Sequence, residues 1–180
     1  MLRTGLGLLG IGMLLLAGCE PNNQGYAPTQ PIAYSHAVHA GALQIPCLYC
    51  HYAAESSRYA GIPPTQVCMN CHTQVLPDRP EIRKLAEAIE TGTPIPWVRV
   101  HWLPDHVYFN HSAHVNGGIT CQTCHGPVQE MGKVEQWAPL TMGWCVNCHR
   151  ASTVDPNAGL IAPEGHAPQH ASTNCVSCHL

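Results

Sequence analysis

Charged side chains are scarce in this sequence of 180 residues. Asp, Glu, Lys and Arg make up 11% of it, and aromatic residues only 6%. The few basic residues form no patch that could neutralise phosphates, so the sequence gives no indication of nucleic-acid binding. With 16 Gly and 16 Pro residues besides, an ordinary hydrophobic core would be thin.

Cysteine, by contrast, is abundant, and ten of the eleven cysteines fall in five Cys-x-x-Cys-His motifs. In such a motif the two thiols bond covalently to a haem and the adjoining histidine binds its iron. Zinc sites, redox pairs and disulfides are the alternatives. Zinc sites built from two motifs each would leave the fifth without a partner. The sequence thus predicts five c-type haems, with thioether bonds to Cys47, Cys50, Cys68, Cys71, Cys121, Cys124, Cys145, Cys148, Cys175 and Cys178, and proximal ligands His51, His72, His125, His149 and His179.

The eleventh cysteine lies at the end of an apolar leader. Arg3 precedes an apolar stretch from Leu6 to Ala17, which is short of the about 20 residues of a bilayer span and is typical of an export signal. The run LAGC ending at Cys19 resembles a bacterial lipobox. We expect residues 1–18 to be a lipoprotein signal peptide and Cys19 to carry lipid, on the periplasmic side of an inner or outer membrane. An uncleaved anchor and a soluble secretory cleavage are the alternatives.

The next segment is rich in Pro, Asn, Gln and Gly. We expect residues 19–33 to form a flexible tether, and residues 34–180 to form a single pentahaem domain.

An internal repeat organises this domain. The stretches YSHAVHAGALQIPCLYCH and FNHSAHVNGGITCQTCHG share an aromatic residue, a His-x-x-His pair, a glycine-bearing loop and a haem motif. The repeats cover about 34–75 and 109–150, and each contains two haem motifs. Histidines at i and i+3 share a helix face while diverging, so one pair can serve two haems. The predicted distal ligands are His36, His39, His111 and His114.

The fifth motif lies outside the repeat, and its distal ligand stays open between two residues. His101 and Met142 are the main candidates, and a methionine ligand would raise the reduction potential of that haem. Met142 could instead pack against a haem edge. Weaker candidates are Met131, His106, His166 and His170.

A helical spacer is predicted between the repeats, over about 78–92. Asp78 is placed to cap it and Pro80 suits its first turn, while Gly92 is placed to end it. Its apolar stripe consists of Ile82, Leu85, Ala86 and Ile89.

Longer runs of sequence resemble a known family. The runs IPCLYCHYAAESSRYAGIPPTQVCMNCH, PIPWVRVHWLPDHVYFNHSAHV, TCQTCHGPVQEM and LTMGWCVNCHR are similar to the pentahaem cytochrome subunit of alternative complex III, a bacterial quinol:cytochrome c oxidoreductase. The likeness covers about 32–179. It implies a haem-organised, class III, c3/c7-like multihaem cytochrome fold of coil and short α-helices with little strand. Similar short pentahaem proteins also accompany other membrane oxidoreductases, so the exact complex stays open.

The resemblance also implies partners and a role. The expected partners are an iron–sulfur subunit, a quinol-binding membrane subunit, and a cytochrome c or terminal oxidase as acceptor, so the chain would be a non-catalytic electron-transfer subunit. One alternative is a free periplasmic electron shuttle. Another is a multihaem reductase, which needs an iron with a vacant position, often marked by a lysine in place of the motif histidine; no such motif occurs here.

Overall fold

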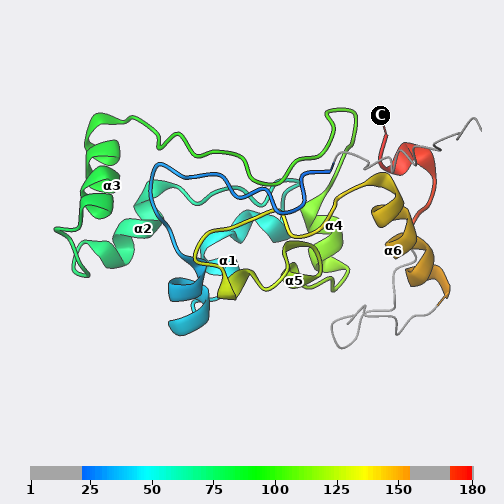
Figure 1. Cartoon of the computed structure of the whole chain (residues 1–180), viewed down its shortest axis with the longest axis horizontal. Coiled ribbons are helices and arrows are strands. Elements are labelled where there is room, and N and C mark those ends of the chain that lie inside the picture. Colours follow the sequence, from blue (N-terminus) through cyan, green and yellow to red (C-terminus); the bar gives the residue numbers. More distant parts are fainter. Residues whose placement is uncertain (1–21, 155–170, 180) are drawn as a thin grey trace, which may run out of the picture.

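Short helices joined by long coil segments make up the described part of the chain (Figure 1). The computed structural model describes residues 22–154 and 171–179. The prediction of coil and short helices with little strand is confirmed, because the only β-pairing in these residues is an isolated bridge between Val107 and His179. The helical elements are η1 Ala37–Ala42, α1 Cys47–Cys50, η2 Tyr52–Glu55, α2 Thr65–His72, α3 Pro80–Thr91, α4 His111–Asn116, α5 Cys121–His125, η3 Val128–Glu130, α6 Met142–Val154 and η4 Cys175–Ser177.

Each haem motif contains a turn of helix. Pro46 and Pro64 precede α1 and α2 in extended backbone, and the fixed φ of proline suits a helix start. Residues three apart on a helix lie on the same face. The two cysteines of a motif are therefore presented side by side, with the histidine at the end of the turn.

The spacer helix α3 begins at Pro80, in its first turn, and ends at Gly92. Gly92 takes a left-handed conformation with φ of 66°, which glycine adopts without a steric cost. The expectation that Asp78 caps this helix is wrong, because the residue at the cap is Arg79 and no side chain caps the helix. Asp78 instead forms an exposed ion pair with Arg83, at 3.3 Å.

A small apolar cluster holds α3 against the first repeat. Ile82 and Leu85 of α3 pack with Ile32, all three being buried, and Cys68 and Met69 of α2 pack against them. The amphipathic stripe predicted from the sequence thus faces the second haem motif.

The segment before Tyr34 lies against the domain. Gly25 donates a backbone hydrogen bond to Gln136 and Gln136 donates one to Tyr26, while the Gln30 side chain exchanges two hydrogen bonds with the backbone of Val98. Residues 25–32, which were expected to belong to a flexible tether, are thus fixed by hydrogen bonds and by burial of Ile32. Cys19 and the predicted signal peptide lie outside the described residues.

The two repeats pack reciprocally. Element η1, which carries the first His-x-x-His pair, contacts η3 after the third motif; α4, which carries the second pair, contacts η2 after the first motif. At the first contact Gly41 approaches the carbonyl of Gln129 so closely that an added Cβ would collide with it. Each helix that carries a His-x-x-His pair is therefore positioned by the opposite repeat.

The molecule is elongated, with α2 and α3 at one end and α6 with the C-terminal segment at the other (Figure 1). None of the helices in residues 22–154 and 171–179 has the length and apolar character needed to cross a bilayer.

Candidate haem-binding site

The cysteines of the first two motifs lie close together. Burial raises the pKa of the Cys50 thiol, and the neighbouring thiols of Cys68, Cys47 and Cys71 raise it further. The first motif also lies close to the third. Burial raises the pKa of the Cys121 thiol, and Cys47 raises it further, both as a neighbouring charge and through a side-chain hydrogen bond. The first motif therefore lies between the second and the third.

The same succession continues through the second repeat. Burial raises the pKa of Cys124 to about 11, with Cys148 and Cys145 of the fourth motif as the next causes. Burial also raises the pKa of Cys145, and here Cys178 of the fifth motif is the first neighbouring cause. The five motifs thus form one unbroken file, in the order of the motifs beginning at Cys68, Cys47, Cys121, Cys145 and Cys175.

Four motif histidines each face a second imidazole. When two imidazoles bind one metal from opposite sides their ring centres lie roughly 6 Å apart, since each metal–nitrogen bond is about 2 Å. The ring centres lie 6.4 Å apart in His36 and His51, 6.1 Å in His39 and His72, 6.0 Å in His114 and His149, and 5.5 Å in His106 and His179.

Three of the predicted distal histidines take part in these pairs. His36 and His39 face different motifs, the first and the second, and His114 faces the fourth. The fourth predicted histidine, His111, lies near His125 of the third motif. Burial lowers the pKa of His125, and the neighbouring His101 and His111 lower it further. By the order of the repeat, His111 corresponds to His36 and the third motif to the first.

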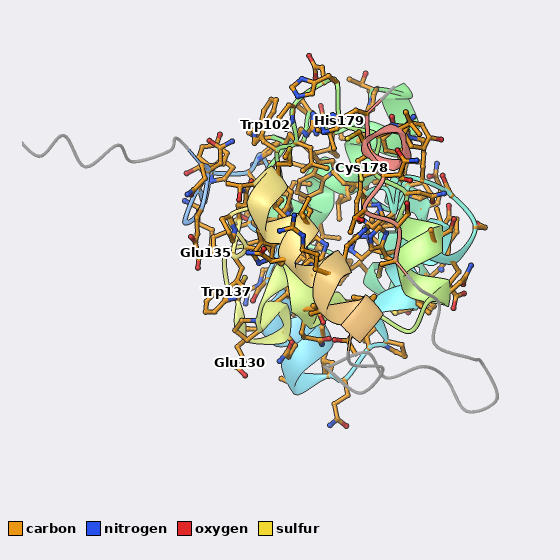
Figure 2. The ribbon with its side chains drawn as sticks, turned by 90° about the vertical axis from the view of Figure 1, so that its right-hand side faces the viewer. Trp102, Glu130, Glu135, Trp137, Cys178 and His179 are labelled. Atoms are coloured by element: carbon orange, nitrogen blue, oxygen red, sulfur yellow. The ribbon has the colours of Figure 1, made fainter. Side chains whose placement is uncertain are left out.

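The fifth motif is paired with His106, which the sequence ranked only as a weak candidate. The bridge between Val107 and His179 and a hydrogen bond from the Tyr108 amide to the Cys178 carbonyl bring the two segments together. Cys178 and His179 are labelled in Figure 2, on the C-terminal segment that this pairing holds. The signal that could have identified His106 was its position five residues before a ligand pair.

The two main candidates for the fifth ligand lie elsewhere. His101 contacts His125, with ring centres 4.4 Å apart and planes at 82°. Met142 begins α6 with 70% of its surface exposed. The Met131 carbonyl accepts a hydrogen bond from the Ala37 amide, whereas His166 and His170 lie outside the described residues.

Backbone carbonyls orient most of these imidazoles. A histidine that binds metal through Nε2 usually donates its Nδ1–H to an acceptor, which fixes the ring. The carbonyl partners are Gly61 for His51 at 2.7 Å, Val75 for His72 at 2.8 Å, Ser172 for His149 at 2.6 Å, Ser35 for His39 at 2.9 Å, Arg58 for His111 at 2.8 Å, Asn110 for His114 at 2.8 Å and, at 3.4 Å, His106 for His179.

His36 and His125 differ from these. The Nδ1 atom of His36 is buried without a hydrogen-bond partner, and Nδ1 of His125 lies 3.1 Å from Nε2 of His101. Burial, followed by neighbouring histidines, lowers the pKa of both His36 and His125 to about 4. Both rings are therefore neutral near pH 7, which is the form that binds a metal.

Aromatic rings stack on the distal pairs in both repeats. Tyr34 lies against His39 with ring centres 4.4 Å apart, and Phe109 lies against His114 at the same distance. The two aromatic residues occupy matching positions in the repeat, so the sequence pattern of aromatic, x, His corresponds to a ring that restrains the ligand.

Arg58 joins the two repeats at His111. Its carbonyl accepts both the Nδ1–H of His111 and the His111 amide, and its guanidinium lies 3.7 Å from the ring centre of Tyr108. A residue between the first two haem motifs thus orients a ligand of the second repeat.

These residues fit covalently attached haem. All ten motif thiols are free, and in three of the facing pairs the ring centres lie 6.0–6.4 Å apart, about the separation that an iron between them requires. Within residues 22–154 and 171–179 no three His, Cys, Asp or Glu side chains are close enough to hold a bare metal ion.

Comparison with known proteins gives two similarities. Residues 107–180 match the family described as cytochrome c7 and related cytochrome c. The chain is also 31% identical, over 172 residues, to the multiheme cytochrome c subunit of menaquinone reductase from Nitratidesulfovibrio vulgaris, an alignment that covers 83% of this chain and 76% of the relative.

Proposed function

Because the chain belongs to the family of multihaem c-type cytochromes that includes cytochrome c7 and this menaquinone reductase subunit, we propose that it is a five-haem electron conduit of a membrane quinone-linked respiratory complex. Electron transfer by covalently bound haem follows from the family. The number of haems, the complex and the partners are the parts we propose.

The observation that carries the proposal is the unbroken file of attachment sites. Cys68 at one end and Cys178 at the other are linked through neighbouring thiols of all five motifs. A bound haem supplies a one-electron iron couple whose potential depends on axial ligands, hydrogen bonding and burial. Five sites in a row allow electrons to enter at one end of an elongated molecule and leave at the other.

Paired imidazoles support conduction rather than catalysis. In the four motifs whose histidine faces a second imidazole, the two rings would hold a bound iron from both sides and would leave no position open to nitrite or a sulfur oxyanion. We assign the ligand pairs as His36 with His51, His39 with His72, His111 with His125, His114 with His149, and His106 with His179.

The relative suggests the setting. Its name places it in a menaquinone reductase, and alternative complex III, which the sequence also resembles, oxidises quinol. We propose that the chain lies on the periplasmic side of the membrane, anchored through lipid on Cys19, and exchanges electrons with an iron–sulfur subunit, a quinol-binding subunit and a further cytochrome or oxidase.

Purification from membranes in mild detergent tests the assembly. Comigration with an integral-membrane quinol-binding subunit is expected, whereas isolation alone would indicate a free shuttle. Mass measurement of the mature chain should show five haems and lipid. Electron paramagnetic resonance should show low-spin iron throughout; a large high-spin, ligand-binding fraction would indicate a reductase.

A further inference from the structure

His125 differs from the other motif histidines in the group that faces its Nδ1 atom. In His51, His72, His149 and His179 this atom faces a backbone carbonyl. In His125 it faces the imidazole nitrogen Nε2 of His101, at 3.1 Å, which is a hydrogen-bond distance.

The geometry separates this contact from axial ligation. The ring centres of His101 and His125 are 4.4 Å apart and their planes are nearly perpendicular, whereas two imidazoles on one metal stand roughly 6 Å apart. If Nε2 of His125 binds the iron, Nδ1 carries the proton and donates it to Nε2 of His101.

The backbone of His101 is held from both sides. Its carbonyl accepts a hydrogen bond from Nε of Arg99 at 2.9 Å. The next amide, of Trp102, donates to the side chain of Gln136 at 2.9 Å, and Gln136 is 1% exposed. The contact with His125 is therefore supported by a buried amide rather than by a mobile surface loop.

The repeat offers a comparison within the chain. His51 is the counterpart of His125 in the first repeat, and its Nδ1 donates to the Gly61 carbonyl at 2.7 Å. Residue 26, ten positions before His36 as His101 is before His111, is a tyrosine. The imidazole partner is thus an addition to the second repeat.

We propose that His101 is a positioning residue for the central haem of the file: it accepts the Nδ1–H of His125 and so orients that ligand and makes it more basic. This rests on the proposed function, because it presumes haem at the third motif. A more basic axial ligand stabilises the oxidised iron, so the contact lowers the potential of the third of five sites.

Substituting His101 tests this in the full lipoprotein. His101→Phe keeps a ring but removes the acceptor, and His101→Gln keeps an acceptor oxygen. With Phe we expect five haems, all low-spin. One reduction potential should be higher by about 59 mV, which corresponds to a tenfold change in a one-electron oxidation equilibrium. The Gln variant should recover part of the shift. Tyr26→Phe, at the position that corresponds to His101 in the first repeat and is 41% exposed, is the matched control and should leave all potentials unchanged.

Two results would overturn the proposal. Five unchanged potentials in His101→Phe would remove the hydrogen bond from consideration, and a new high-spin, carbon monoxide-binding iron would make His101 an axial ligand. The haem count from mass measurement separates both from a failure of the proposed function. If His101→Phe does not mature, the electron paramagnetic resonance spectrum of the parent protein decides. One of its low-spin signals should show a stronger axial ligand field than the others, and five identical signals would refute the role of His101.

Discussion

The two repeats share a ligand plan and differ in how the ligands are held. In each repeat an aromatic ring stacks on the second histidine of the pair, and each ligand helix rests on the other repeat. Yet Nδ1 of His36 is buried without a partner, while Nδ1 of its counterpart His111 donates to Arg58. Duplicated ligands can thus give irons with different surroundings, because the hydrogen bonds around a ligand tune the metal separately from the ligand itself.

Breaking the file at an inner position should have the largest effect. In a Cys145→Ala, Cys148→Ala variant we expect four haems and a gap between the third and fifth motifs. Cys68→Ala, Cys71→Ala is the matched control, because it also leaves four haems but removes an end of the file. Rapid-mixing reduction should become biphasic in the first variant, with the isolated haem slow, and stay monophasic in the control. Equal kinetics would contradict the order of the motifs.

Removing corresponding ligands compares the repeats directly. His36→Ala and His111→Ala should each open one iron of five and leave all haems attached. Because only His111 has an Nδ1 partner, its loss should also disturb the contact with Arg58 between the repeats. The measurements are the high-spin fraction by electron paramagnetic resonance and the haem count by mass. An unchanged low-spin spectrum in either variant would remove that residue from the ligand set.

Truncating the apolar cluster should weaken the first repeat alone. Leu85 is 5% exposed and packs beside Cys68, so Leu85→Ala should lower the free energy of unfolding by about 2–5 kcal/mol. Ile89→Ala on the same helix, at a residue that is 38% exposed, should cost much less. Thermal unfolding followed by visible absorbance checks this, and equal losses in the two variants would argue against the packing.

The smallest effect is expected at Met142. Since its side chain is 70% exposed and His106 lies opposite His179, Met142→Leu should leave the redox titration superimposable on that of the parent. A fall in one potential would show that the methionine ligates after all.

Sequence was informative where chemistry fixes the spacing. Covalent haem attachment uses the spacing Cys-x-x-Cys-His, and two residues three positions apart share one face of a helix. The haem motifs and the two His-x-x-His pairs could therefore be identified in the sequence. The partner of His179 could not be predicted, because His106 is brought to it by the bridge between Val107 and His179, which are 72 residues apart in the sequence. The role of His101 depends likewise on a contact across 24 residues, and the position of residues 25–32 depends on hydrogen bonds to distant Gln136 and Val98.

The scarcity of buried apolar side chains has a consequence for how the protein is made. In the described part of the chain only Ile32, Ala54, Ile82, Leu85 and Ala138 are buried hydrophobic residues, too few to offset the entropy of ordering the backbone. The polypeptide without haem should therefore stay unfolded until porphyrins are attached, which keeps its cysteine thiols accessible for that attachment. Maturation and folding then become a single event, and a chain that misses a porphyrin is open to proteolysis.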